Sequence, residues 1–420
     1  MPDQPQRDAT KPSPLWDPTF GWFLLVFFLL NVGQGVFPPL LPQIMEDLGL
    51  SFATAGLIGT GYGLARSLVD MPAGMLLERL GVPRVLHIAL ALLTAGTALS
   101  ALAPSFLVMV LARALLGVGS GLTMVVSILY LMRRAPSGHQ GRRANIYEVA
   151  VIAGMAVSAD LGGMIGSRWG WRWSFVVGTG IMLLAWAVAA WAVLPAIRHL
   201  LEDRPAADAP IASPQAAPMA TPGALLAIYV LVFTQSVAWG GGISTLFPLY
   251  GGRELGMSSG TLGRIMAIAF WVEVVLLLPV GWAMDAWGKL RVLTPGFFAM
   301  LLGCLLCAFT RGTFAYGAAY TLLVGGMSVW MAAPGLLVER LGSRFRGKAA
   351  GTYRLAIDLA MIIAPGLVGW LIDIGGFRAA GVALALIISL SLSLSLAFLR
   401  GHARPSPARA ASNPGSNPDL

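Results

Sequence analysis

The chain has 420 residues, of which 57% are hydrophobic and only 11% are charged. This composition leaves too little polar surface for a soluble protein of this length, and it predicts an integral membrane protein. The formal net charge is +9, but the Lys and Arg residues are dispersed over short segments between apolar stretches. We therefore expect a lipid bilayer as the surroundings and no nucleic-acid partner.

Twelve apolar stretches are each long enough to cross a hydrocarbon core of about 30 Å as a helix. In chain order they are 19–43, 55–77, 85–103, 106–131, 146–167, 173–195, 224–248, 262–284, 291–310, 315–338, 350–373 and 379–399. The predicted fold class is therefore all-α and membrane-embedded, with twelve transmembrane helices. We expect an N-terminal arm at 1–17, six-helix halves at 18–197 and 223–400, a Pro/Ala-rich linker at 198–222 and a disordered tail at 401–420.

The two halves are related by a repeat with a spacing of about 207 residues. The segment Met71-Pro72-Ala73-Gly74 recurs as Leu278-Pro279-Val280-Gly281, and the same spacing relates Gly49 to Gly256 and Gly81 to Gly288. A duplication of apolar segments is typical of secondary transporters, whose binding site lies where the two halves meet.

The distribution of basic residues predicts the orientation. If the N-terminus is cytoplasmic, 19 of the 28 Lys and Arg residues lie in cytoplasmic segments and six lie outside. The positive-inside rule then places the arm, the linker and the tail in the cytoplasm, and we expect a multi-pass protein of the inner (cytoplasmic) membrane.

Two related motifs follow the second and the eighth stretch. Gly74-Met75-Leu76-Leu77-Glu78-Arg79-Leu80-Gly81-Val82-Pro83-Arg84 resembles the G-x-x-x-D-R-x-G-R/K-R/K signature of the major facilitator superfamily, and its copy contains Gly281, Asp285, Gly288, Lys289 and Arg291. The resemblance implies a conformational latch, in which the small residue allows a close helix approach and the acid forms a charge-assisted contact. The first copy has Glu78 where Asp is usual, and Val82 and Pro83 are interposed.

The resemblance extends along the chain. Pro39-Leu40-Leu41-Pro42 is similar to the first helix of twelve-helix facilitators, Arg113-Ala114-Leu115-Leu116-Gly117-Val118-Gly119 resembles the R-x-x-x-G-x-G motif of the fourth, and Gly170-Trp171-Arg172-Trp173 resembles the entry to the sixth. One departure is Ser158-Ala159-Asp160-Leu161-Gly162-Gly163, where drug antiporters usually have Gly-Pro before Gly-Gly. This departure weakens an antiporter assignment.

Charged residues are left inside the apolar spans, among them Arg66, Asp70, Arg113, Glu148, Glu273, Arg354 and Asp358. A charge there costs at least about 2.5 kcal/mol by insertion scales unless it is paired or hydrated. One interpretation is structural, because Arg66 with Asp70 and Arg354 with Asp358 are i,i+4 pairs.

The other interpretation is functional. The repeat maps Arg66 onto Glu273 and Glu148 onto Arg354, and the resembled fold places these residues on helices that meet and part during transport. Arg66, Asp70, Glu148, Glu273, Arg354 and Asp358 are therefore candidates for gating and proton coupling, with Asp160 held in reserve.

Uncharged polar groups provide candidates for a solute site. Asn31, Gln34, Gln235 and Trp239 lie on the first and seventh stretches, which line the central cavity in the resembled family, and Arg113 adds a positive charge. Helix-to-helix hydrogen bonding is the alternative role for the amides. Cys304 and Cys307 lie within an apolar stretch and are expected to pack in the core. We expect no metal site, no cofactor and no catalytic residue.

The sequence thus predicts a monomeric transporter of a small organic solute that works by alternating access, is proton-coupled and favours efflux. Proton-coupled uptake of an organic anion is the first alternative. A non-transporting assembly factor or sensor with the same fold is the second.

Overall fold

The computed structural model describes residues 16–134, 140–198, 221–307, 309–340 and 346–399. All regular elements in these ranges are helical. The predicted arm, linker and tail lie outside the described residues except at their edges, so their conformation stays a prediction.

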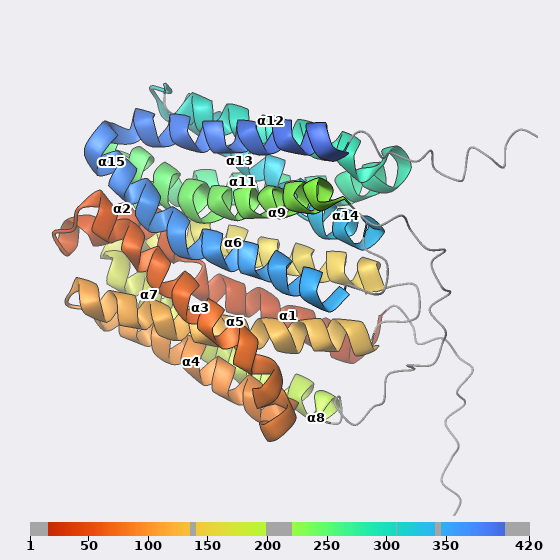
Figure 1. Cartoon of the computed structure of the whole chain (residues 1–420). Helices are drawn as coiled ribbons and strands as arrows, with labels where there is room; N and C mark the ends of the chain where they lie inside the picture. Colours follow the sequence, from red (N-terminus) through yellow and green to blue (C-terminus); the bar gives the residue numbers. More distant parts are fainter. Residues whose placement is uncertain (1–15, 135–139, 199–220, 308, 341–345, 400–420) are drawn as a thin grey trace, which may run out of the picture.

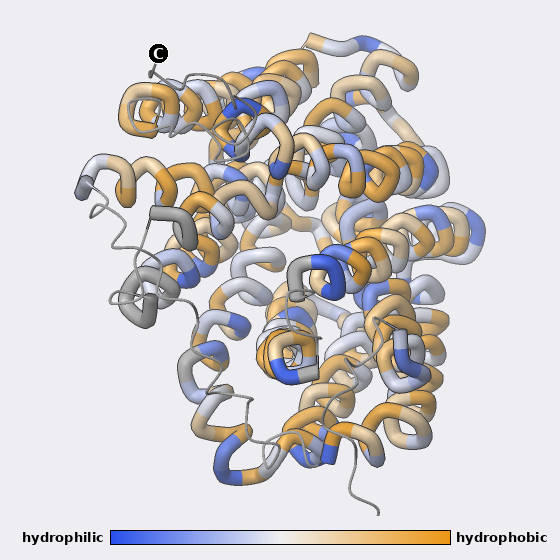
Figure 2. Tube along the Cα trace, turned by 90° about the vertical axis from the view of Figure 1, so that its right-hand side faces the viewer, coloured by the Kyte–Doolittle hydropathy of each residue, from blue (hydrophilic) through white to orange (hydrophobic). Residues whose placement is uncertain are grey.

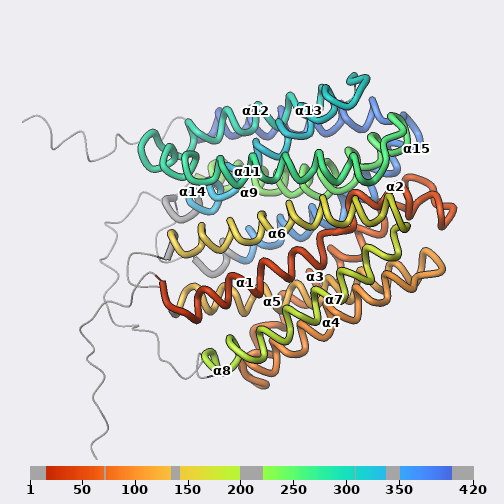
Figure 3. The backbone as a smooth tube through the Cα atoms, turned by 180° about the vertical axis from the view of Figure 1, so that it is seen from behind, coloured from red at the N-terminus to blue at the C-terminus, as the bar shows by residue number. Residues whose placement is uncertain are grey.

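The helices alternate in direction across a bundle (Figures 1 and 3). The first half contains α1 (Pro18–Gln34), α2 (Phe37–Asp47), α3 (Phe52–Leu80), α4 (Val82–Leu102), α5 (Phe106–Arg134), α6 (Gln140–Trp169), α7 (Trp171–Val188), the π-helical turn η1 (Ala189–Val193) and α8 (Leu194–Ile197). The second half contains α9 (Pro222–Val237), η2 (Ala238–Leu246, π-helical), α10 (Phe247–Leu249), η3 (Tyr250–Glu254, π-helical), α11 (Ser259–Trp287), α12 (Lys289–Cys307), α13 (Thr313–Gly326), the 3₁₀ turn η4 (Met327–Val329), α14 (Ala332–Arg340) and α15 (Arg346–Leu399).

These elements confirm the twelve-helix fold. Ten helical segments in the described ranges are long and apolar enough to cross a membrane, and one of them runs from Gly351 to Leu399. That segment is two spans joined at a bend, because Gly376 has a φ of 72° within α15. The remaining span is α3, a helix of 29 residues that contains Arg66 and Asp70.

Apolar residues predominate along the helices (Figure 2), and many large apolar side chains point outward. Leu102, Trp191 and Val275, for example, are more than two-thirds exposed. Exposed apolar side chains on all sides of a helical bundle are what a hydrocarbon environment requires.

The internal repeat is visible in the helix ends. Ser51 caps α3 by accepting a hydrogen bond from the Thr54 N–H, and Ser258, which is 207 residues later, caps α11 in the same way. At the other ends Gly81 and Gly288 stop the same helices with φ values of 78° and 89°, which other residues rarely adopt. The duplication therefore fixes equivalent helix boundaries in both halves.

The start of α1 and the end of α15 lie at the same end of the bundle (Figure 1). We call this the inner end and the opposite one the outer end. The halves meet along two helix pairs, α3 with α15 and α6 with α11. In the order of the predicted spans, these are the second with the eleventh and the fifth with the eighth.

Close packing of backbones joins the halves toward the outer end. A Cβ atom at Gly56 would collide with the Pro365 carbonyl, and one at Gly263 would collide with the Ala159 carbonyl. The two contacts are equivalent under the repeat. Asp373 adds a contact across α3 and α15, because its carboxylate accepts hydrogen bonds from the Phe52 and Ala53 N–H groups at 3.1 and 2.8 Å.

Ion pairs close the same end. Glu46 pairs with Arg253 at 3.0 Å, and these residues are 207 positions apart, so they are repeat equivalents that meet at the pseudo-two-fold axis. Asp160 pairs with Arg264 at 3.4 Å, and both side chains are well exposed. These contacts hold the outer end closed in this structure.

Candidate functional site

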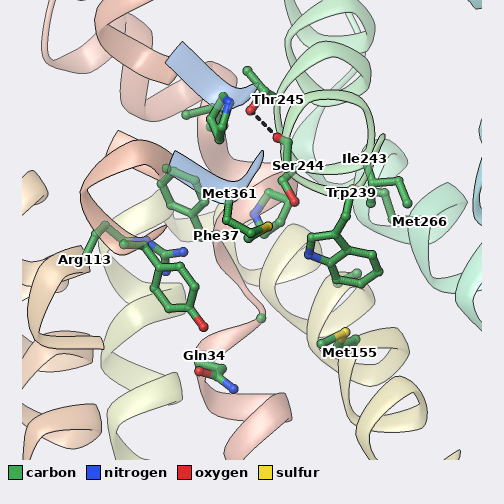
Figure 4. A pocket seen from close by; sticks show the side chains of 18 of the residues that line it. Gln34, Phe37, Arg113, Met155, Trp239, Ile243, Ser244, Thr245, Met266 and Met361 are labelled. Atoms are coloured by element: carbon green, nitrogen blue, oxygen red, sulfur yellow. Dashed lines mark hydrogen bonds between the residues drawn. The ribbon is translucent and has the colours of Figure 1, made fainter. Parts of the chain in front are cut away.

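A cavity of about 130 Å³ lies between the two halves (Figure 4). Four of the five residues predicted to bind a solute line it: Asn31, Gln34, Arg113 and Trp239. The rest of the wall is rich in aromatic and sulfur-containing side chains, which include Phe37, Tyr62, Met155, Met266, Phe270 and Met361. The walls therefore offer a mainly apolar surface with a few polar groups, as solute sites usually do.

The break between α1 and α2 shapes one wall. Gly35 ends α1 and Pro38 begins the first turn of α2, so the chain bends beside the cavity. Asn31 donates to the Phe27 carbonyl at 2.8 Å and accepts from the Gln34 amide at 3.2 Å. Part of the hydrogen-bonding capacity of these two amides is thus used within α1, and neither bond is the helix-to-helix contact given as their alternative role.

Gln235 differs from its prediction as a solute-binding residue. Its side chain is fully buried and is not part of the cavity wall. Neither amide atom has a hydrogen-bond partner in the described part of the chain. Trp239, one turn later, does reach the wall and lies 6.1 Å from the Phe270 ring.

Arg113 is held between two aromatic rings. Its guanidinium carbon lies 4.3 Å from the ring centre of Phe37 and 5.1 Å from that of Tyr62. Its Nε has no hydrogen-bond partner, and among the described residues it forms no ion pair. Cation–π contacts compensate part of the desolvation cost. In Figure 4, Arg113 and Trp239 approach the cavity from opposite sides.

Four predicted gating residues gather where α3 meets α15. Arg354 forms ion pairs with Asp70 of the other half and, at 3.4 Å, with Asp358 of its own helix. The i,i+4 pairing predicted for Arg354 and Asp358 is therefore present, whereas Asp70 contacts Arg354 and not Arg66.

Arg66 occupies an unusual position in this cluster. Its Nη2 lies 2.7 Å from the Met124 sulfur, which is also 3.2 Å from Arg354 Nη1. Its Nε has no partner, and no ion pair of Arg66 occurs among the described residues. Two guanidiniums thus share one thioether, a weak acceptor that does not neutralise either charge.

The two predicted glutamates lie on the other helix pair. Glu148 belongs to α6 and Glu273 to α11, and the two carboxylates are near enough to interact electrostatically. Glu273 is 3% exposed, and its Oε2 has no hydrogen-bond partner in the part of the chain that the structure describes. Neither acid forms an ion pair with another described residue. The roles predicted for all these charges stay predictions.

The predicted latch residues lie at the inner ends of α3, α4, α11 and α12. Glu78, Arg79, Arg84, Asp285 and Arg291 are exposed. Among the described residues, a Cβ at Gly74 would meet no atom within 4 Å, and one at Gly281 would meet only the Asn145 amide, at 3.9 Å. The close helix approach that a latch requires is therefore not made in this outer-closed structure.

Sequence reasoning missed Tyr62 and Phe270 as wall residues. Helical periodicity could have predicted both, because Tyr62 precedes Arg66 by four positions and Phe270 precedes Glu273 by three, and residues at these spacings share a helix face. The signal for both residues is therefore an aromatic side chain three or four positions before a charge within an apolar span.

Two pseudo-symmetric six-helix halves with a cavity between them are the architecture of a class of secondary transporters. The cavity is bordered by the same two helix pairs that close the outer end.

Comparisons with known proteins agree with this class. The sequence model of the Major Facilitator Superfamily matches residues 23–263 and 228–418, and the chain belongs to this family. It is 31% identical over 190 residues to the "Multidrug resistance protein B homolog" of Mycobacterium tuberculosis, which covers 45% of this chain and 34% of that protein. The chain thus spans only about a third of the length of that relative.

Two further matches cover more of the chain. The "Putative multidrug resistance protein MdtD" of Salmonella typhimurium is 24% identical, with 85% of this chain and 73% of that protein covered. The crystal structure of the nucleoside transporter NupG is 14% identical and has a TM-score of 0.66, with 91% of this chain and 99% of that chain covered. This structural likeness shows a shared fold.

Proposed function

We propose that the protein exports small amphipathic organic solutes by proton-coupled alternating access, as a monomer in the inner membrane with both termini in the cytoplasm. The observation that carries the proposal is the cavity at the junction of the halves, which combines an aromatic and Met-rich wall with Arg113, Asn31 and Gln34. Two relatives with multidrug-resistance names favour export of such solutes. The proposal assigns the protein transport and no catalysis.

Proton coupling is supported by the buried carboxylates. Glu148 and Glu273 lie at the α6–α11 contact without a cationic partner among the described residues, and Asp70 pairs across α3 and α15. Protons bind to carboxylates that lose their counter-ions or are desolvated, so relative movement of the halves changes their protonation.

Proton-coupled uptake of an organic anion is the second candidate. It is favoured by Arg113, a guanidinium in the cavity wall that no acid of the described chain neutralises.

Transport in proteoliposomes tests the proposal. The purified chain is reconstituted, a pH gradient is imposed, and accumulation of a panel of anionic, neutral and cationic naphthalene derivatives is measured. We expect at least one compound to accumulate against its gradient and to equilibrate when the pH gradient is dissipated. Efflux from preloaded cells that express the protein then separates export from uptake. Passive equilibration of the whole panel, equal to that of empty liposomes, would contradict the proposal.

A further inference from the structure

Charge is distributed unequally around the cavity. The side formed by α3, α5 and α15 contains three arginines within the membrane spans, Arg66, Arg113 and Arg354, and two carboxylates, Asp70 and Asp358. Both carboxylates pair with Arg354. When all five groups are ionised, this side has one excess positive charge. Arg66 and Arg113 are the two arginines that form no ion pair with the described residues.

The two arginines without an ion pair among the described residues lie on α5 and α3, which pack against each other. Arg113 lies in the cavity wall beside the Tyr62 ring. Arg66 follows Tyr62 by one helical turn toward the inner end of α3. Both have a buried Nε that finds no hydrogen-bond partner in the described ranges. A buried guanidinium donor left unpaired is costly, and the cost is recovered when an anion accepts from it.

The opposite side has the reverse charge. Glu148 and Glu273 lie at the α6–α11 contact and have no cationic partner among the described residues. These carboxylates repel an anion when they are ionised, so they do not bind its charged group. Neither glutamate lines the cavity, and Arg113 is the charged residue of its described wall.

The wall opposite Arg113 fits an apolar body. Trp239 and Phe270 form a ring pair with centroids 6.1 Å apart, and Met155 and Met266 line the same wall. Flat rings stack on Trp and Phe, and thioethers adapt to their edges. A solute with a negative group at one end and an aromatic body at the other would satisfy both walls.

On the basis of the proposed function, we propose that the transported solutes are amphipathic aromatic anions, whose negative group binds Arg113 in the cavity and passes Arg66 on its way to or from the inner end. The cavity selects against cations of the same shape, because Arg113 repels them.

Three compounds of matched shape test the charge preference: 2-naphthoate, 2-naphthamide and 2-naphthylmethylammonium. Binding to the purified full-length chain is measured by isothermal titration calorimetry. We expect naphthoate to bind about tenfold more tightly than the amide, the difference typical of a hydrogen bond to a charged group. The ammonium compound should bind more weakly than the amide.

Substitutions of Arg113 test whether this residue causes the preference for the anionic compound. Arg113→Gln should bring naphthoate affinity down to that of the amide, while Arg113→Lys should retain most of the preference. Arg172→Gln is the matched control, since Arg172 pairs with Asp47 at 2.5 Å near the outer end and is not part of the cavity wall. This control should leave all three affinities within about twofold. A thermal unfolding curve for each variant verifies that it is folded.

The outcomes of these measurements distinguish failure of the anion assignment from failure of the proposal that the protein is a transporter. Equal or tighter binding of the amide or the ammonium compound, absence of naphthoate binding at millimolar concentration, or a preference that persists in folded Arg113→Gln would overturn the anion assignment. Proton-driven accumulation of the ammonium compound in proteoliposomes would do the same and would leave the transporter proposal intact. Should Arg113→Gln fail to fold, the ranking of the three compounds on the unmodified chain still decides.

Discussion

Arg354 of α15 contacts one carboxylate on its own helix and another on the opposite half of the molecule. Such a residue is a shared counter-ion. Its removal leaves two acids uncompensated, whereas removal of either acid leaves Arg354 with the other.

We therefore expect Arg354→Ala to impair transport more than Asp70→Asn or Asp358→Asn. The loss of stability from breaking one such pair is about 1–3 kcal/mol, less than for a fully buried pair because Arg354 is 24% exposed. Initial transport rates in proteoliposomes and thermal unfolding of the three variants provide the comparison. Equal effects of the three substitutions would show that Arg354 is not shared in the working protein.

Neutralising the carboxylates should have a different effect. Glu273→Gln and Glu148→Gln keep the side-chain volume but remove the proton-binding group, so we expect substrate movement to continue down its own gradient while its response to an imposed pH gradient is lost. Accumulation ratios measured at several pH gradients test this expectation.

Asp70→Asn and Asp358→Asn complete the carboxylate series. If all four variants responded to the pH gradient as the unmodified chain does, the carboxylates would be structural groups. Asp160, which pairs with Arg264 near the outer end, would then be the next residue to test for coupling.

At the scale of the helices, α3 and α11 are packed tightly near their outer ends and loosely near their inner ends. Near their beginnings, the glycines Gly56 and Gly263 are packed against carbonyl groups of α15 and α6, while near their inner ends Gly74 and Gly281 have free space around them. The same helices therefore contain two sets of small residues, and only the outer set is in use in this structure. Alternating access requires the inner set to be used when the outer one separates.

Bulky substitutions at the outer and inner ends of these helices should consequently trap two different states of the protein, one with the outer end open and one with it closed. Gly263→Val blocks the contact with Ala159 and should hold the outer end open. Gly74→Leu fits this structure but blocks a close approach at the inner end, so it should hold the outer end closed. Both variants should insert normally and lose transport.

Cysteine accessibility measures the trapped state. A single Cys at position 34, in a chain with Cys304 and Cys307 replaced by Ser, is labelled from outside with a membrane-impermeant maleimide. Labelling should be faster in Gly263→Val and slower in Gly74→Leu than in the parent. Gly180→Val is the control, because a Cβ at Gly180 meets no atom within 4 Å. Unchanged labelling and transport in both test variants would mean that these glycines do not gate.

At the scale of the whole molecule, the positive-inside pattern and the structure give one topological expectation. α1 begins, α8 ends, α9 begins and α15 ends at the inner end of the bundle (Figure 1). Reporters fused after residue 210 and at the C-terminus should therefore report the cytoplasm, and one inserted near Arg253 should report the outer side. Phosphatase and fluorescent-protein fusions measure this, and reversed signals would invert the assigned orientation.

The sequence by itself determined the fold class, the twelve spans and the duplication. These depend on local quantities: the length of apolar stretches, the capping residues Ser51 and Ser258, and glycines such as Gly81 and Gly288 that recur at a fixed spacing. Because a bilayer forces each apolar stretch of this length to become a spanning helix, composition along the chain is sufficient to predict them.

Tertiary structure decided which side chains meet and which end is closed. Asp70 pairs with Arg354 and not with Arg66, Gln235 does not line the cavity, and Tyr62 and Phe37 enclose Arg113. All three results depend on how helices distant in sequence are rotated and placed against each other. Rotation of a helix about its axis is set by packing across both halves, where many weak contacts add up. No local pattern in the sequence encodes that sum.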